Sequence, residues 1–154
     1  MTIPAYKLFV ERVAGGKVEA ELMVPVGASA HTYEPTPKQV IQASKADIWF
    51  TTGEAFETRA LRALQAYNPG LQQVDLTKGV ALLSADPNHK CQGGHCHHGA
   101  NDLHFWLSPR LVQIQVDTIV GALQNRYPAD AELFAKNGMA LKKELGELDE
   151  ELRG

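Results

Sequence analysis

The chain has 154 residues, of which 44% are hydrophobic and 21% charged, and its formal net charge is -3 at pH 7. This length and composition predict one globular domain with a core of its own. No run of lysine or arginine occurs, so the sequence lacks the basic surface that binds nucleic acid or anionic membrane. It also lacks an apolar run near the ~20 residues that span a bilayer.

Short β-favouring runs alternate with helical patterns in the first half of the chain. We expect strands at residues 18–24, 47–51 and 72–76, with a strand remnant at Ile3. The expected helices cover residues 6–14, 37–46 and 56–67. This alternation predicts an α/β fold, with a parallel sheet of about four strands and helices on both faces.

Two longer helical patterns follow in the second half. Ser108 and Pro109 are typical of the start of the first of these helices, and Pro128 opens the second. In the second helix leucines recur at amphipathic spacing, at Leu141, Leu145, Leu148 and Leu152. We predict a lobe over residues 1–127 and the start of a long backbone helix over residues 128–154. The leucine face, residues 141–152, is expected to be exposed and available for self-association.

Five of the six histidines and both cysteines lie between residues 89 and 109. Imidazole and thiolate bind borderline-soft divalent ions such as zinc, so this segment is first of all a metal signal. Residues 88–101, which include the first part of this segment, combine several glycines with few apolar residues. This composition predicts a mobile His-rich loop that captures metal transiently. The candidate residues for this auxiliary capture are His89, Cys91, His95, Cys96, His97 and His98.

Other interpretations of the loop stay open. Cys91, His95 and Cys96 around one ion would form a structural zinc site, although such sites usually take their ligand pairs from separated segments. The loop could also be a solvated polar segment without a metal role. The two cysteines would close a small disulfide ring in an oxidising compartment and remain thiols or metal ligands in a reducing one. Their spacing therefore does not decide the compartment.

His31 and His104 are the candidates for a defined metal site. His31 lies in a loop that joins an expected strand to the next helix, and such loops emerge at the carboxyl edge of a parallel sheet, where open α/β folds bind ligands. His104 lies just before another helix start, so we expect the two histidines to converge. Asp102, two residues before His104, is placed to contact the His104 ring and orient it without itself binding the ion. Because a lone loop histidine is more often a surface residue than a ligand, the hypothesis depends on this convergence.

Three motifs occur in a specific order, at residues 23–37, 46–53 and 102–109. The first reads Met-Val-Pro-Val-Gly-Ala-Ser-Ala-His-Thr-Tyr-Glu-Pro-Thr-Pro, the second Ala-Asp-Ile-Trp-Phe-Thr-Thr-Gly and the third Asp-Leu-His-Phe-Trp-Leu-Ser-Pro. Together they closely resemble the zinc and manganese solute-binding proteins of bacterial ABC importers. In that family the histidines of the first and third motifs are metal ligands, which the resemblance places at His31 and His104. The zinc branch often carries a His-rich loop before the third motif, as here.

The sequence departs from the family pattern at two positions beside these histidines. The family commonly has proline where this chain has Ala30 and Leu103, and neither change removes a ligand. Family members also have a second α/β lobe after a long backbone helix, and that lobe supplies two further ligands. The chain is therefore expected to be the amino-terminal lobe alone, without the leader or the carboxy-terminal lobe, and to bind metal weakly.

The resemblance implies a binding protein and not an enzyme. Such a protein captures zinc, or manganese, in the periplasm or outside the cell, in association with the membrane, and delivers it to the permease subunit of the importer. Two other classes remain open. An intracellular zinc metallochaperone or sensor would use the Cys/His loop with reduced cysteines. A zinc hydrolase would need an activated water, and the sequence offers no general base at a recognisable spacing from either histidine.

Overall fold

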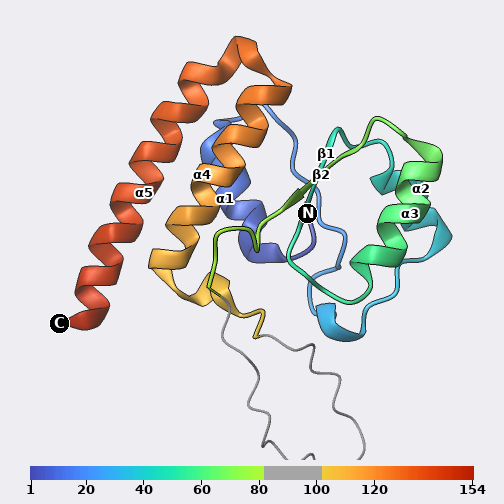
Figure 1. The fold of residues 1–154 in the computed structure, drawn as a ribbon, viewed down its shortest axis with the longest axis horizontal. Coiled ribbons are helices and arrows are strands. Elements are labelled where there is room, and N and C mark those ends of the chain that lie inside the picture. Colours follow the sequence, from blue (N-terminus) through green and yellow to red (C-terminus); the bar gives the residue numbers. More distant parts are fainter. Residues whose placement is uncertain (82–101) are drawn as a thin grey trace, which may run out of the picture.

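The computed structural model describes residues 1–81 and 102–154 (Figure 1). Its helices and strands are, in chain order, α1 (Pro4–Ala14), α2 (Pro37–Ala43), β1 (Ile48–Thr51), α3 (Glu57–Tyr67), β2 (Gln72–Asp75), α4 (Pro109–Arg126) and α5 (Ala131–Arg153). Three short 3-10 turns accompany them, η1 (Ala30–Thr32), η2 (Phe105–Leu107) and η3 (Pro128–Asp130). Among these helices, none is both long enough and apolar enough to cross a membrane.

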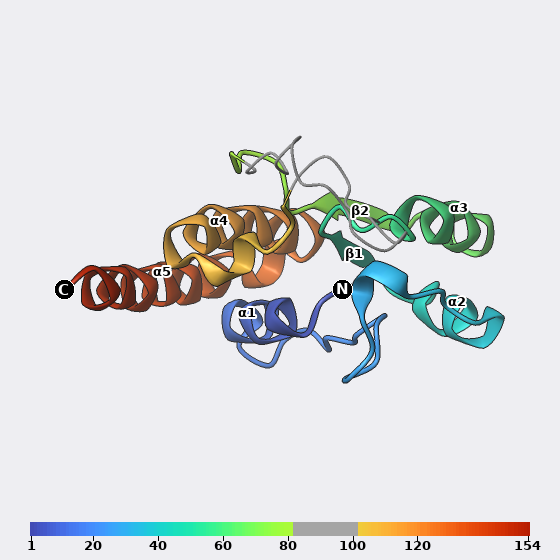
Figure 2. The same ribbon diagram turned by 90° about the horizontal axis from the view of Figure 1, so that it is seen from below.

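The centre of the fold is a parallel pair of strands with helices on both faces. β1 and β2 pair in register from Ile48 opposite Gln72 to Thr51 opposite Asp75, and α3 forms the connection between them. Neighbouring residues of a strand point to opposite faces. Trp49 accordingly belongs to a cluster with residues of α2 and α3, whereas Phe50 belongs to one with α1, α4 and α5. Figures 1 and 2 show these two groups of helices on either side of the strands, so the predicted two-sided α/β fold is confirmed.

The prediction of about four strands is wrong for the described residues, because the sheet there has two. Residues 18–24 form no strand. Among residues 1–81 and 102–154 their backbone pairs only with Met1, through bonds from the Met1 amino group to the Glu21 carbonyl and from the Met23 N–H to the Met1 carbonyl. A groove separates this segment from the amino end of β1. Ile3 is not a strand residue either, because Pro4 starts α1 directly after it.

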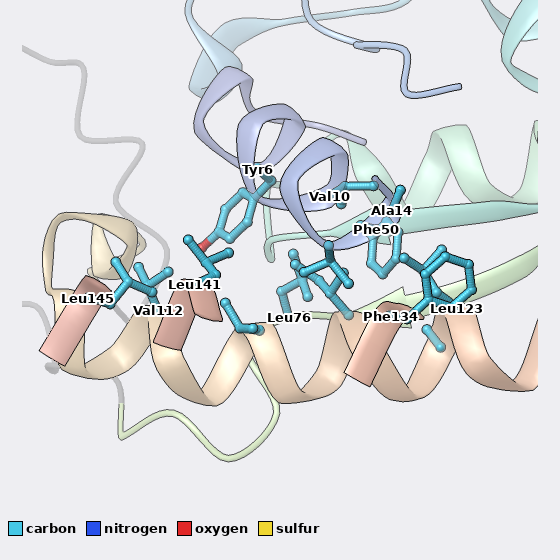
Figure 3. Packing of buried hydrophobic residues seen from close by; sticks show 14 of the residues in the cluster. Tyr6, Val10, Ala14, Phe50, Leu76, Val112, Leu123, Phe134, Leu141 and Leu145 are labelled. Carbon is cyan, nitrogen blue, oxygen red and sulfur yellow. The ribbon is translucent and has the colours of Figure 1, made fainter. Parts of the chain in front are cut away.

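Helices α1, α4 and α5 enclose the main hydrophobic core, part of which is drawn in Figure 3. Phe134 of α5 is fully buried there. Gly138 allows α5 to approach α4 closely, because a Cβ atom at this position would lie 2.4 Å from the Val120 side chain. The close packing of α5 on α4 therefore depends on a residue without a side chain.

The predicted exposure of the leucine face of α5 is wrong for its first two residues. Leu141 and Leu145 are 4% and 9% exposed because they pack into the main core, whereas Leu148 and Leu152 remain 43% and 69% exposed. The amphipathic pattern was identified correctly, but half of it already has a partner within the lobe. Only the last turns of α5 present leucine to the surface.

Candidate metal site

The candidate site lies where both strands end. Residues 52–54 follow β1 directly, and Thr77 follows the end of β2. Gly53 adopts a left-handed conformation with φ +89°, and a Cβ atom there would lie 3.2 Å from the Leu103 side chain and 3.4 Å from Thr77. The segment that carries His104 therefore packs onto the carboxyl edge of the sheet, which is the expected place for a ligand site in an open α/β fold.

His31 and His104 converge at this edge, as predicted. Their ring centroids are 5.4 Å apart and the ring planes are inclined by 67°. His31 lies in η1 and His104 directly precedes η2, so the two rings come from distant parts of the sequence. About half of each side chain is exposed, 45% for His31 and 51% for His104. The pair is thus held at the surface of the lobe, where an ion can reach it.

His104 is oriented by its own segment. Asp102 accepts a hydrogen bond from the His104 backbone N–H at 2.9 Å, and the same oxygen lies 2.7 Å from Nδ1 of the ring. The backbone N–H and then the ring of His104 lower the pKa of the Asp102 carboxyl. Trp106 lies beside the imidazole, with ring centroids 5.2 Å apart, and Phe105 between them is buried in the main core. Asp102 thus has the contact with His104 that the sequence suggested.

His31 is engaged by Glu54, one of several isolated carboxylates that the sequence offers as neighbours of the histidines without marking any one of them for His31. Oε2 of Glu54 lies 3.1 Å from Nδ1 of His31, and the Glu54 side chain is only 2% exposed. In the sequence Glu54 is one acidic residue among several near helix ends, so no motif marks it. The available signal was its position, because a residue three places after a parallel strand belongs to the same edge as His31.

Glu57 organises the backbone beneath the site. Its carboxylate accepts hydrogen bonds from the backbone N–H groups of Thr52, Gly53 and Glu54 at 2.8 to 3.1 Å, and from the hydroxyl of Thr2. Burial raises the pKa of Glu57, an effect that these hydrogen bonds oppose. A buried carboxylate needs such donors, so the conformation of residues 52–54 and the buried Glu57 side chain stabilise each other.

The two imidazoles are suited to bind one metal ion through Nε2, since a carboxylate engages each Nδ1. For two imidazoles on one tetrahedral zinc with Zn–N near 2.0 Å, the ring centroids should be about 5 Å apart. The observed 5.4 Å is close to this value. Within residues 1–81 and 102–154, no group of three or more His, Cys, Asp or Glu side chains is arranged to hold an ion. Among the described residues, the His31 and His104 pair is therefore the candidate metal site.

The predicted auxiliary capture residues and the question of a disulfide between the two cysteines lie outside the described residues. These residues are His89, Cys91, His95, Cys96, His97 and His98. The His-rich loop thus remains a prediction from the sequence.

A two-sided α/β lobe that brings two histidines to the carboxyl edge of its sheet is typical of a ligand-binding domain. The chain belongs to the family described as zinc-uptake complex component A, periplasmic (ZnuA), whose family model matches residues 1–154. The resemblance inferred from the three motifs is therefore confirmed.

Individual relatives and solved structures agree with this membership. The chain is 30% identical over 150 residues to the high-affinity zinc uptake system protein ZnuA of Bacillus subtilis, an alignment that covers 95% of this chain and 47% of that protein. It is 29% identical over 140 residues to the manganese-binding lipoprotein MntA of Halalkalibacterium halodurans, covering 91% and 43%. A crystal structure of ZnuA matches with a TM-score of 0.84 at 31% identity, over 98% of this chain and 55% of the other. The chain spans about half the length of these relatives.

Proposed function

We propose that this chain binds one divalent metal ion between His31 and His104. In the whole protein this lobe captures the ion outside the cytoplasmic membrane, for delivery to the permease subunit of an ABC importer. The observation that carries the proposal is the 5.4 Å separation of the two rings, with a carboxylate at Nδ1 of each. This arrangement leaves two neutral imidazole nitrogens for the same ion, and a carboxylate behind an imidazole raises its basicity as a ligand.

Zinc is the proposed ion, with manganese as the alternative. Imidazole nitrogen suits zinc, whereas manganese prefers carboxylate, carbonyl and water oxygen. Both carboxylates at the site contact the histidines and leave the metal position to nitrogen and solvent. The relatives carry names for both metals, zinc for ZnuA and manganese for MntA. The nitrogen ligands of this lobe support zinc.

We also propose that residues 1–127 form the metal-binding lobe and that residues 128–154 begin an interdomain helix leading to a second lobe with further ligands. The relatives are about twice as long as this chain, which leaves room for such a lobe. Leu148 and Leu152 of α5 are exposed and offer it an apolar surface, or a surface for self-association. With two ligands in place of four, the lobe alone should bind zinc weakly.

The role is proposed to be binding and not catalysis. The carboxylates nearest to the two histidines, Glu54 and Asp102, are already engaged by the rings. Neither is therefore free to act as the general base that a zinc hydrolase needs. The proposed chemistry is reversible coordination of the ion.

Calorimetric zinc titration tests the proposal. A variant without residues 89–99 should be titrated first, so that binding to the predicted His-rich loop does not hide the pair. In this background His31→Ala and His104→Ala should each reduce affinity by more than the roughly tenfold expected for a residue that only orients a ligand. The double variant should lose little more than either single variant, because one ion needs both rings.

The matched control is Thr32→Ala, which removes an exposed side chain from the same 3-10 turn and leaves both imidazoles in place. It should titrate like the parent. The proposal is wrong if neither histidine substitution weakens binding, or if the two losses simply add as they would for two independent sites.

A further inference from the structure

The turn that carries His31 is weakly held by its own hydrogen bonds. In η1 the backbone N–H of Thr32 lies 3.4 Å from the Ser29 carbonyl, and that of Tyr33 lies 3.5 Å from the Ala30 carbonyl. Both distances exceed the usual 2.7 to 3.2 Å for such bonds, which means weak attraction. The ring itself is nearly half exposed. The turn alone would leave the imidazole several orientations.

Glu54 supplies the missing constraint from another part of the chain. Its carboxylate is almost fully buried, and its Oε2 meets Nδ1 of His31 at 3.1 Å. Its other oxygen, Oε1, is buried and has no hydrogen-bond partner among the described residues. A buried carboxylate with one unpartnered oxygen is stabilised when an N–H group donates to its other oxygen, which here is Oε2 beside His31. The neutral His31 ring is therefore favoured with its proton on Nδ1, and its lone pair is on Nε2.

Glu57 fixes the position from which Glu54 acts. It accepts hydrogen bonds from the three consecutive N–H groups of residues 52–54, and its own N–H donates to the Glu54 carbonyl at 3.0 Å. Gly53, in the middle of this loop, lies beside Leu103, which directly precedes His104: a Cβ atom added at Gly53 would be 3.2 Å from the Leu103 side chain. One loop thus sets the place of the carboxylate behind His31 and touches the segment of the partner histidine.

We propose that Glu54 is the positioning residue of His31: its buried carboxylate accepts a hydrogen bond from the Nδ1–H group and directs Nε2 toward the ion, and Glu57 holds Glu54 in place through the 52–54 backbone. This inference rests on the proposed metal site and names how one half of it is prepared before the ion arrives. Glu54 is not itself a ligand, because its oxygen lies on the Nδ1 side of the ring, away from Nε2.

The charge of Glu54 also favours a divalent ion. Glu54 and Asp102 together place two negative charges behind the two neutral imidazoles. Glu54 is buried, whereas about half of the Asp102 side chain is exposed. Water and salt screen a buried charge less, so Glu54 should contribute the larger share of the attraction.

Two substitutions of Glu54 separate position from charge; the tautomer is measured in the full chain, and zinc affinity in the variant without residues 89–99, so that the predicted His-rich loop does not hide the pair. Glu54→Gln keeps an oxygen that can accept a hydrogen bond from the Nδ1–H group and removes the charge, whereas Glu54→Ala removes both. The matched control is Glu34→Gln, because Glu34 is an exposed carboxylate that pairs with Arg59. The readouts are zinc affinity, by competition with a chromophoric chelator, and the His31 tautomer, by nitrogen NMR of the metal-free chain at mildly alkaline pH. The His31→Ala variant assigns the His31 signals.

The wild-type chain and Glu54→Gln should show the Nδ1–H tautomer at His31. Glu54→Ala should shift the ring toward Nε2–H and reduce zinc affinity by roughly tenfold or more, with a smaller loss in Glu54→Gln. Glu34→Gln should change neither readout.

A Glu54→Ala chain with the wild-type tautomer overturns the proposal, whatever its stability, and so does one with wild-type affinity. If His31→Ala weakens zinc binding but Glu54→Ala does not, the metal site stands and only this inference fails. If His31→Ala has no effect, the proposed function itself is wrong.

Discussion

His104 and His31 reach the same point of the molecule by different means. His104 is oriented by Asp102, two residues earlier, and the next residue, Phe105, is buried in the main core. His31 is oriented by Glu54, which is distant in sequence, and its turn lies over the smaller core, where Tyr33 contacts Phe56. One half of the site is therefore a local motif with a strong anchor. The other half depends on tertiary structure.

The largest expected effect concerns the anchor of His104. Phe105→Ala should lower the free energy of unfolding by about 3–5 kcal/mol, because it removes a buried aromatic ring from the main core. Leu107→Ala in the same turn is the control, since Leu107 is 73% exposed and its loss should cost less than about 0.5 kcal/mol. Urea unfolding of both variants checks this. Equal losses would mean that the turn is not anchored through Phe105.

The next effect concerns the carboxylate that organises the loop on the His31 side. Glu57→Gln should destabilise the lobe by about 1–3 kcal/mol, because the amide NH2 group is a donor and would face buried N–H donors that now point at a carboxyl oxygen. Burial raises the pKa of Glu57 above its ordinary value of 4.5, so the folded chain holds this proton more tightly than the unfolded chain. The stability that results is present below the ordinary pKa and is lost as the pH rises through the raised pKa.

Urea unfolding of the wild type and Glu57→Gln from acid to neutral pH tests this sign. Because glutamine does not titrate, the deficit of the variant should be largest at acid pH and should shrink as the pH rises. A deficit that grows with pH would show that the hydrogen bonds outweigh burial and lower the pKa of Glu57.

A smaller effect is expected at the contact between the two halves of the site. Gly53→Ala should cost about 1–2 kcal/mol for the left-handed backbone, plus the cost of the close approach to Leu103. Gly27 has the same φ of +89° with no atom within 4 Å of an added Cβ, so Gly27→Ala measures the backbone cost alone. Urea unfolding and zinc titration should both show the larger loss for Gly53→Ala. Equal losses would mean that the loop yields without disturbing Leu103.

The smallest effect on stability is expected at Asp102. The backbone N–H and ring of His104 lower the pKa of this exposed carboxyl, so its contribution is present above the ordinary pKa and is lost as the pH falls through the lowered pKa. The deficit of Asp102→Asn should therefore disappear at acid pH, the reverse of the trend for Glu57→Gln, and it should shrink in high salt. Denaturation over the same pH series compares the two. Trends of the same sign would contradict the difference drawn between the two halves.

The sequence predicted those features that depend on local patterns. The convergence of His31 and His104 could be predicted because both lie in loops that precede helices, and an α/β fold brings such loops to one edge. The Asp102 contact could be predicted because it spans two residues. Glu54 could be named only as one of several carboxylates that might approach the histidines, because its role depends on a tertiary contact and one carboxylate in a loop has no periodicity to mark it.

The incorrect predictions have the same origin. Residues 18–24 favour the β conformation, but a strand also needs a partner, and within the described part of the chain the backbone of this segment bonds only to Met1. The leucine spacing of α5 predicted an apolar face correctly, but it could not reveal that Leu141 and Leu145 already pack in the main core. The leucine spacing identifies which face of the helix is apolar, but the tertiary structure is needed to show which other residues cover that face.

The central claim is that His31 and His104 bind the same ion, and X-ray absorption spectroscopy of the zinc complex tests it most directly. The variant without residues 89–99, loaded with one equivalent of zinc, should show two imidazole nitrogens at about 2.0–2.1 Å, with oxygen from solvent completing the shell. His31→Ala and His104→Ala should each reduce the imidazole count to one. The same imidazole count in the parent and both variants would contradict the account.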